Sequence, residues 1–117
     1  MKTSEILEFW TSQELELAPH EGFRFGSPET ELTGVLVCWL PSRAAIAEAR
    51  RLGCSLIIGR DPFNYPMDYS GARIDHNLSD RVTLGRVHAL VEGGLTVFRA
   101  HTSLDKLVTE SLADALG

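Results

Sequence analysis

The sequence predicts a layered α/β domain with mainly parallel strands and helices on both faces of the sheet. Short apolar runs alternate with segments whose apolar residues recur about every three to four positions, which is typical of strands alternating with helices. Glycine or proline stands at most borders between the two patterns. This order of elements is also that of right-handed crossovers, which build parallel sheets.

The amino-terminal part predicts one helix and one short strand. The helix begins after a cap at Thr3 or Ser4, ends before Pro19, and shows an apolar face made of Ile6, Leu7, Phe9 and Trp10. Residues 23–25 alternate like a strand and lie between two glycines. A helix followed by a strand therefore precedes the regular part of the chain.

The middle of the chain predicts a strand, a helix and a second strand. Residues 35–40 form a continuous apolar run, as expected for a strand covered on both faces. Ser42 caps the following helix, which ends at Gly53 and turns these residues inward: Ala45, Ile46, Ala49 and Leu52. Residues 55–58 form the next buried strand.

The carboxyl-terminal half repeats the pattern after a turn-rich stretch, residues 59–78. A helix begins at Ser79 or Asp80, ends at Gly93, and has one apolar side formed by Leu84, Val87, Leu90 and Val91. Residues 95–98 predict a third strand. The last helix carries a stripe of Leu104, Leu107, Val108, Leu112 and Ala115.

Composition narrows the classes of function. The 117 residues suffice for one domain, residues 1–117, and the net charge of −5 leaves no basic surface for nucleic acid. The longest apolar run is far shorter than the roughly 20 residues of a membrane span, and the first residues lack a signal-peptide pattern. We expect a soluble, cytoplasmic protein in which Cys38 and Cys54 are small buried side chains without a disulfide.

Polar residues follow each of the three strands of the regular part, and the carboxyl ends of parallel strands meet at one edge of a sheet. The three loops there are 41–42, 59–62 and 100–103. His101 and Asp105 can converge on a metal ion or act as an acid and base pair. Thr102 with Asp105 equally fits a helix-capping pattern, which the residues alone favour.

The loop after the second strand offers a different chemistry. Asp61 could be a hard oxygen ligand, and the planar guanidinium of Arg60 could hold an anionic substrate. An Arg-Asp-Pro sequence is also an ordinary surface turn. Arg99 precedes His101 at the same edge, so Arg60 and Arg99 together are candidates for binding an anion such as phosphate.

A family resemblance rests on an ordered series of motifs. Gly22-Phe-Arg-Phe-Gly26, Leu56-Ile-Ile-Gly-Arg-Asp-Pro62 and Val97-Phe-Arg-Ala-His-Thr-Ser-Leu-Asp105 resemble the amino-terminal half of the Nif-three-like family, many of whose members are named GTP cyclohydrolase I type 2 homologue. The resemblance implies one half of that fold, a dinuclear divalent metal site and toroidal hexamers. It also implies that Asp105 is a metal-ligating carboxylate with His101 beside the site.

The chain departs from the family pattern at the metal site. The family has Ser-His-His-Pro where this chain has Gly59-Arg60-Asp61-Pro62, and both family histidines bind metal. A guanidinium cannot ligate a cation and repels one. The family's further His and Glu ligands come from a carboxyl-terminal half that would follow Gly117.

Two functional hypotheses follow from the departures. The first is a domain with a degraded dinuclear metal site that serves as a non-catalytic binding or assembly module, with no metal cofactor. The alternative is a metal-dependent hydrolase or cyclohydrolase with a single divalent ion at Asp61, Asp105 and His101. Exposed aromatic residues predict a homo-oligomer in either case, and a small anion is a possible ligand. Nucleic acid and membrane are not expected partners.

Overall fold

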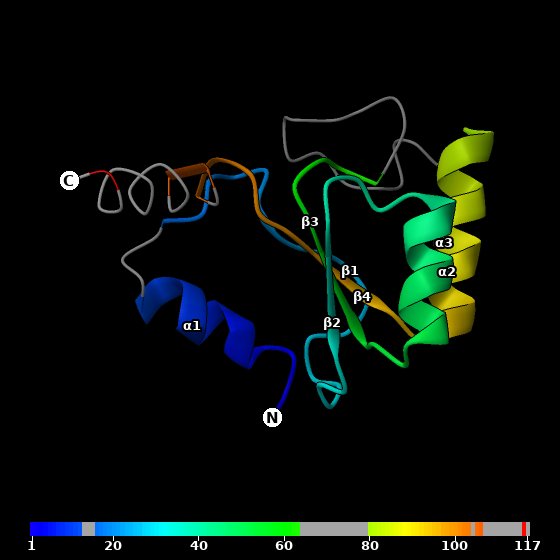
Figure 1. The fold of residues 1–117 in the computed structure, drawn as a ribbon, viewed down its shortest axis with the longest axis horizontal. Helices are drawn as coiled ribbons and strands as arrows, with labels where there is room; N and C mark the ends of the chain where they lie inside the picture. The colour runs from blue at the N-terminus through cyan, green and yellow to red at the C-terminus, as the bar shows by residue number, and fades with distance from the viewer. Residues whose placement is uncertain (13–15, 64–79, 104, 107–115, 117) are drawn as a thin grey trace.

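A computed structural model of the chain describes residues 1–12, 16–63, 80–103, 105–106 and 116 (Figure 1). The helices and strands occur in this order: α1 (Glu5–Ser12), β1 (Gly22–Phe25), β2 (Val35–Cys38), α2 (Arg43–Arg51), β3 (Leu56–Gly59), α3 (Arg81–Gly93) and β4 (Thr96–Arg99). Most of the predicted turn-rich stretch, residues 59–78, and the apolar stripe of the last helix lie outside the described residues. Of the predicted last helix, the structure describes residues 102–103, 105–106 and 116, which are helical.

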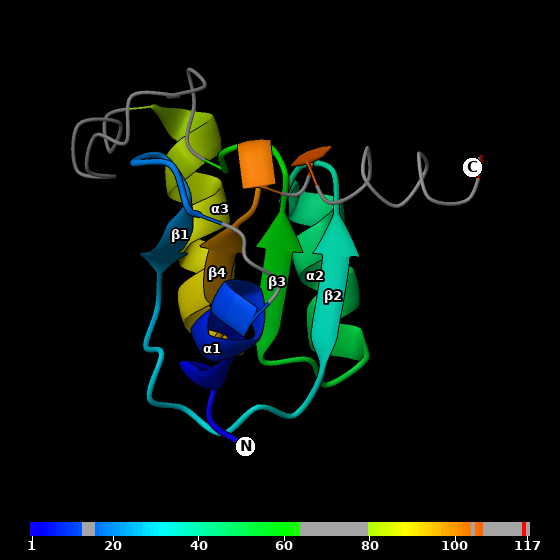
Figure 2. The ribbon, with the colours of Figure 1, turned by 90° about the vertical axis from the view of Figure 1, so that its left-hand side faces the viewer.

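The four strands form one mixed sheet in the order β1-β4-β3-β2. β2, β3 and β4 are parallel, with Val35, Leu56 and Thr96 in register, whereas β1 runs antiparallel to β4. This confirms the predicted α/β class. Because the three parallel strands end at the same edge, the loops that follow them lie next to one another (Figure 2).

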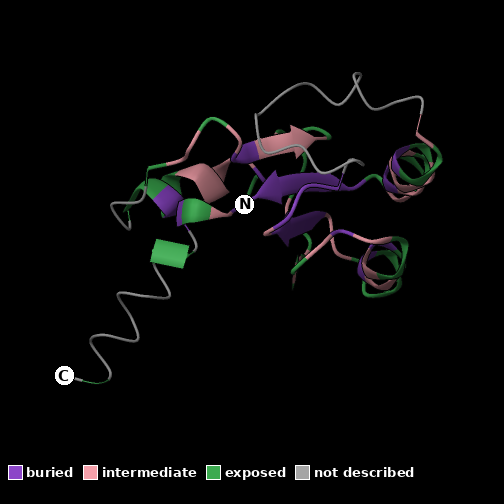
Figure 3. Ribbon diagram, turned by 90° about the horizontal axis from the view of Figure 1, so that it is seen from above, coloured by how far each residue is buried: buried purple, intermediate pink, exposed green. Residues whose placement is uncertain are grey.

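Helices cover both faces of the sheet, as predicted. α2 and α3 pack on one face, where Ile46 and Leu90 are fully buried in a core that includes Ile57. α1 lies across the other face, where Trp10 packs with its indole ring 5.4 Å from the ring of Phe98 (Figure 2). The central strands β3 and β4 are therefore buried on both sides (Figure 3).

Local chemistry fixes the helix ends where the sequence indicated. The Ser42 hydroxyl accepts from the amide of Ala45 at 3.2 Å and caps α2. The Asp80 carboxylate likewise caps α3, and Gly94 ends that helix in the left-handed region at φ 61°. These contacts satisfy backbone groups that a helix end leaves without intrahelical partners.

The expectation that residues 35–40 are covered on both faces is wrong. β2 is an edge strand, and α1 covers only the central strands, so Val35, Val37 and Trp39 project from the uncovered side of β2. The side chain of Val37 is 67% exposed and that of Trp39 is 65% exposed. The continuous apolar run of residues 35–40 therefore belongs to an edge strand and carries a row of exposed apolar side chains, Val35, Val37 and Trp39.

Four further positions are more exposed than their periodicity indicated: Phe9, Leu52, Leu84 and Val91. Each lies at the margin of a helix face or just past a helix end, where the sheet does not reach. Cys38 and Cys54 are both free thiols and partly buried. Among the described residues, no helix is long and apolar enough to cross a bilayer.

Candidate functional site

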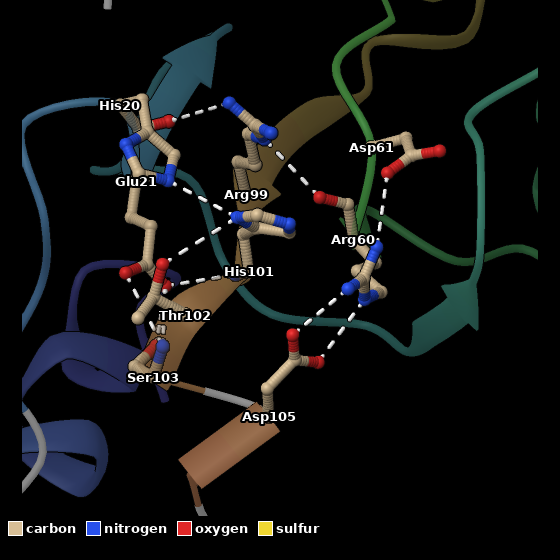
Figure 4. Close-up of polar contacts among 9 residues, drawn as sticks. All are labelled: His20, Glu21, Arg60, Asp61, Arg99, His101, Thr102, Ser103 and Asp105. Atoms are coloured by element: carbon tan, nitrogen blue, oxygen red, sulfur yellow. Dashed lines mark hydrogen bonds and ion pairs between the residues drawn. The ribbon is translucent and has the colours of Figure 1, made fainter. Parts of the chain in front are cut away.

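Arg60 and Asp105 are joined across the carboxyl edge of the sheet (Figure 4). Arg60 follows β3, and its Nε and Nη2 donate to Oδ1 and Oδ2 of Asp105 at 3.1 and 2.8 Å. Two parallel bonds between a planar guanidinium and a carboxylate are the strongest common form of ion pair. Both oxygens of the Asp105 carboxylate therefore accept from one cation of the same chain.

Two further groups surround the Arg60 guanidinium. Its central carbon lies 4.3 Å from the ring centroid of Trp39, which is a cation–π contact. Its Nη1 lies 3.4 Å from Oδ1 of Asp61. The Arg60 side chain is only 22% exposed, so the positive charge sits within the loop cluster and is balanced there by two carboxylates.

The pKa of Asp105 reflects this pairing. The hydrogen bonds from Arg60 lower the pKa of the carboxyl below its usual range, partial desolvation opposes them, and the Arg60 and His101 charges lower it further. The Asp105 carboxylate is ionised near neutral pH and is already matched by a fixed positive charge. A divalent ion would have to displace that charge to bind here.

Arg99 has a structural position. Its side chain is 2% exposed, and its Nε donates to the carbonyl of Arg60 at 3.1 Å. Its Nη1 donates to the carbonyl of His20 at 3.2 Å. Of the two residues predicted to bind an anion, Arg99 is buried and holds two loops together, whereas Arg60 lies nearer the surface.

His101 turns toward the amino-terminal segment of the chain. Its Nδ1 lies 3.2 Å from Nε2 of His20, and the two rings meet edge to face with centroids 5.3 Å apart. The pKa of the His20 imidazole is lowered, first by burial and then by the Arg99 charge. No spacing in the sequence pairs these two histidines, because the antiparallel pairing of β1 with β4 brings them together.

Glu21 is a buried residue of the site that the sequence reading missed. The residue is 7% exposed. Its carboxylate accepts hydrogen bonds from the amides of Ala18 at 3.0 Å and His101 at 2.8 Å. The amide of Ser103 and the Ser103 hydroxyl also donate to it. The Ser103 oxygen in turn accepts from Trp10 Nε1 at 2.9 Å.

This network supplies the cap that was predicted from Thr102 and Asp105. The carboxylate that meets the first amides of the last helix is Glu21, from the start of β1, and both Asp105 oxygens face Arg60 instead. Burial alone would raise the Glu21 pKa, but the hydrogen bonds from Ser103, His101 and Ala18 outweigh it and lower the pKa. In the sequence, the feature that could have indicated this role is that Glu21, an acidic residue, directly precedes the glycine that begins β1.

The predicted metal ligands Asp61, Asp105 and His101 are not brought to one point. Arg60 lies between the two carboxylates, and His101 faces His20 (Figure 4). Within the part of the chain that the structure describes, no three His, Cys, Asp or Glu side chains are placed to hold a metal ion. The described residues therefore do not fit a dinuclear centre at this edge.

Sequence comparison relates the chain to a protein family and to a named bacterial protein. Residues 3–117 match the family model described as Duf34/NIF3 (NGG1p interacting factor 3). A protein of Lactococcus lactis named GTP cyclohydrolase 1 type 2 homolog is 34% identical over 94 residues, covering 80% of this chain and 34% of that protein. The chain thus spans about a third of that relative's length.

Solved structures share the fold at lower identity. The Bacillus cereus protein related to NIF3 superposes with a TM-score of 0.70 at 19% identity, covering 90% of this chain and 28% of that one. Reduced HcgD from Methanocaldococcus jannaschii gives a TM-score of 0.70 at 24% identity, covering 90% and 41%. With a family match over residues 3–117 and a fold shared with these solved structures, the chain belongs to the Duf34/NIF3 family.

Proposed function

We propose that this chain is a Duf34/NIF3 domain whose dinuclear metal site is degraded and that serves as a non-catalytic binding or assembly module. The observation that supports this proposal is the bidentate pair between Arg60 and Asp105. The family resemblance implies that Asp105 is a metal ligand. In this chain the Arg60 guanidinium, and not a metal ion, is the cation paired with the Asp105 carboxylate. Arg60 is a permanently charged donor, so it cannot be converted into a ligand by deprotonation.

Energetics favour the internal cation over a metal ion. Displacing Arg60 would break two charge-assisted bonds and the contact with Trp39, and would leave a largely covered guanidinium near the incoming ion. Asp61 would also lose its nearest positive charge. A site that retains two carboxylates and no convergent imidazole offers too little in return.

The assembly role is supported by the exposed row on β2. Val35, Val37 and Trp39 project from the same side of an edge strand that has no charged residue and no proline between positions 35 and 39. Edge strands of monomeric proteins usually carry such blocking residues. We propose that a second copy covers this row, which makes the protein a homo-oligomer.

The rival function is a metal-dependent hydrolase with one ion at Asp61, Asp105 and His101. It requires Arg60 to swing out of the loop cluster and His101 to leave His20. Both functions can be separated by asking whether metal binding depends on Asp105, because the hydrolase needs that carboxylate as a ligand whereas the binding module uses it to hold Arg60.

The experiment measures metal content by mass spectrometry after dialysis. Wild-type protein, the double variant Arg60→His/Asp61→His, and both forms carrying Asp105→Asn are compared. We expect tightly held zinc, manganese or iron only in the double variant, and its loss when Asp105→Asn is added. Near-stoichiometric metal in the wild type that disappears with Asp105→Asn would overturn the proposal and support the hydrolase.

Self-association is tested separately by sedimentation equilibrium. Val37→Lys places a charge in the centre of the exposed row without touching the core, since Val37 is 67% exposed. We expect the wild type to associate and the variant to be monomeric. Arg51→Ala, which alters an exposed residue on α2, serves as the control and leaves association unchanged. A monomeric wild type would contradict the assembly role.

A further inference from the structure

The facing imidazoles of His20 and His101 form a second polar centre beside the Arg60–Asp105 pair (Figure 4). Their nearest nitrogens, Nε2 of His20 and Nδ1 of His101, are 3.2 Å apart, and both rings are partly exposed. One residue precedes β1 and the other follows β4, so the antiparallel pairing of these strands holds the two rings together.

The separation of the two nitrogens is suitable for a direct hydrogen bond and also for two ligands of one metal ion. Two imidazoles bound to one tetrahedral zinc ion at about 2.0–2.1 Å place their nitrogens about 3.3–3.4 Å apart. The observed distance of 3.2 Å lies just below that range. The backbone therefore already brings the two donors to the spacing that chelation needs.

We propose that His20 and His101 form a two-imidazole site for a divalent transition-metal ion of the zinc type, with water completing its coordination. Neutral imidazole is a ligand suited to Zn²⁺, Ni²⁺ and Cu²⁺ and poorly suited to Mg²⁺ or Ca²⁺. This site uses neither Asp61 nor Asp105. It therefore goes beyond the proposed function and is independent of it.

Charged groups of both signs surround the two rings. The buried carboxylate of Glu21 accepts from the His101 amide at 2.8 Å, and the buried guanidinium of Arg99 donates to the His20 carbonyl at 3.2 Å. Near His20, the Glu21 carboxylate attracts a cation, whereas the guanidiniums of Arg99 and Arg24 repel one. This differs from the Asp105 carboxylate, whose partner is a cation.

A cavity adjoins Thr102, the residue that follows His101. Thr102 Oγ1 is 3.5 Å from His101 Nδ1, and Thr102 also lines a cavity of about 360 Å³ together with Glu16, Ser103 and Lys106. A volume of this size holds several water molecules. Because both rings are partly exposed, the metal would keep exchangeable positions, and we expect reversible binding and not a permanently bound ion.

The test titrates the full chain with zinc chloride at about pH 7.5, where imidazole with its ordinary pKa of about 6.5 is mainly neutral. Calorimetry gives the affinity, and NMR of the imidazole rings identifies the ligands. We expect about one Zn²⁺ per chain, with the ring signals of His20 and His101 shifting together. His20→Gln and His101→Gln should each weaken zinc binding by about 10- to 100-fold or more, because loss of a group that only supports a metal ligand already costs that much.

His88→Gln is the matched control, because His88 is exposed on α3 and lies beside Glu92. It should leave the zinc affinity within about twofold, as a residue outside the site would. Asp105→Asn should do the same. Absence of zinc binding, or shifts confined to His88, would overturn this inference and leave the proposed function intact. Binding that is lost in Asp105→Asn but kept in His20→Gln would overturn both.

Discussion

Arg60 and Asp105 connect the end of β3 with the first helical turn after β4 through two hydrogen bonds of 3.1 and 2.8 Å. Two different loops are thereby tied by a single guanidinium, whose face also lies 4.3 Å from the ring centre of Trp39. Arg60 thus ties two loops of this domain together, at a position where the family resemblance implies a metal-binding histidine.

Removing the Arg60 guanidinium should cost a moderate amount of stability. Arg60→Met keeps the aliphatic part of the side chain but loses both bonds to Asp105, whose side chain is 49% exposed. We expect the free energy of unfolding to fall by about 0.5–1.5 kcal/mol, the range between a solvated and a partly buried ion pair. Urea unfolding followed by circular dichroism measures it. Arg51→Met, which breaks a fully solvated pair with Glu48, should have a smaller effect.

Glu21 should make the domain sensitive to acid. Its folded-state pKa is lowered from the ordinary value of 4.5, so its contribution to stability is complete above that value and is lost as the pH falls through the folded-state pKa. Glu21→Gln should lower the free energy of unfolding at neutral pH by about 1–3 kcal/mol, because an amide group then faces backbone donors. It should also flatten the decline in stability below about pH 4.5. An unchanged acid profile in the variant would contradict this assignment.

Trp10 and Ser103 should be energetically coupled. The indole N–H donates to the Ser103 hydroxyl at 2.9 Å, and both residues are buried. In a double-mutant cycle of Trp10→Phe and Ser103→Ala, we expect a coupling of about 1 kcal/mol in the free energy of unfolding. The same cycle with Phe9→Ala in place of Ser103→Ala supplies the contrast, since Phe9 shares only a ring contact with Trp10. Additive effects of the first two substitutions would show that the hydrogen bond contributes nothing.

Gly26 should tolerate no side chain. Its φ is 90°, and a Cβ there would lie 2.7 Å from the Cα of Thr96 and 2.8 Å from the carbonyl of Leu95. Gly53 has φ 74° but open space around the same position. We expect Gly53→Ala to cost about 1 kcal/mol of backbone strain and Gly26→Ala to cost at least about 2–3 kcal/mol more. Thermal unfolding of the two variants compares them, and equal losses would refute the close approach of β1 to β4.

The sequence was sufficient for the helix ends and the fold class. Caps such as Ser42 and Asp80 act within a few residues, so their chemistry can be read from local order. The exposed face of β2 could not be read in this way, because an apolar run is the same whether its strand is central or at an edge. Only the strand order decides which it is.

In the candidate site, too, the residues that follow the parallel strands could be predicted, whereas those that depend on long-range pairing could not. Arg60, Asp61, His101 and Asp105 were identified because they follow strands whose ends share one edge. The partners Glu21 and His20 were missed because they reach the site through β1, whose pairing with β4 spans most of the chain. Long-range pairings of this kind leave no local pattern in a single sequence.

The central claim is that Arg60 holds the carboxylate that relatives are expected to use for metal. An anomalous diffraction map from crystals grown with zinc, manganese or iron tests it most directly. We expect Nε and Nη2 of Arg60 to lie on the Asp105 carboxylate, with no metal bonded to Asp105 or Asp61. Ions bound between these two carboxylates, with Arg60 turned away, would contradict it.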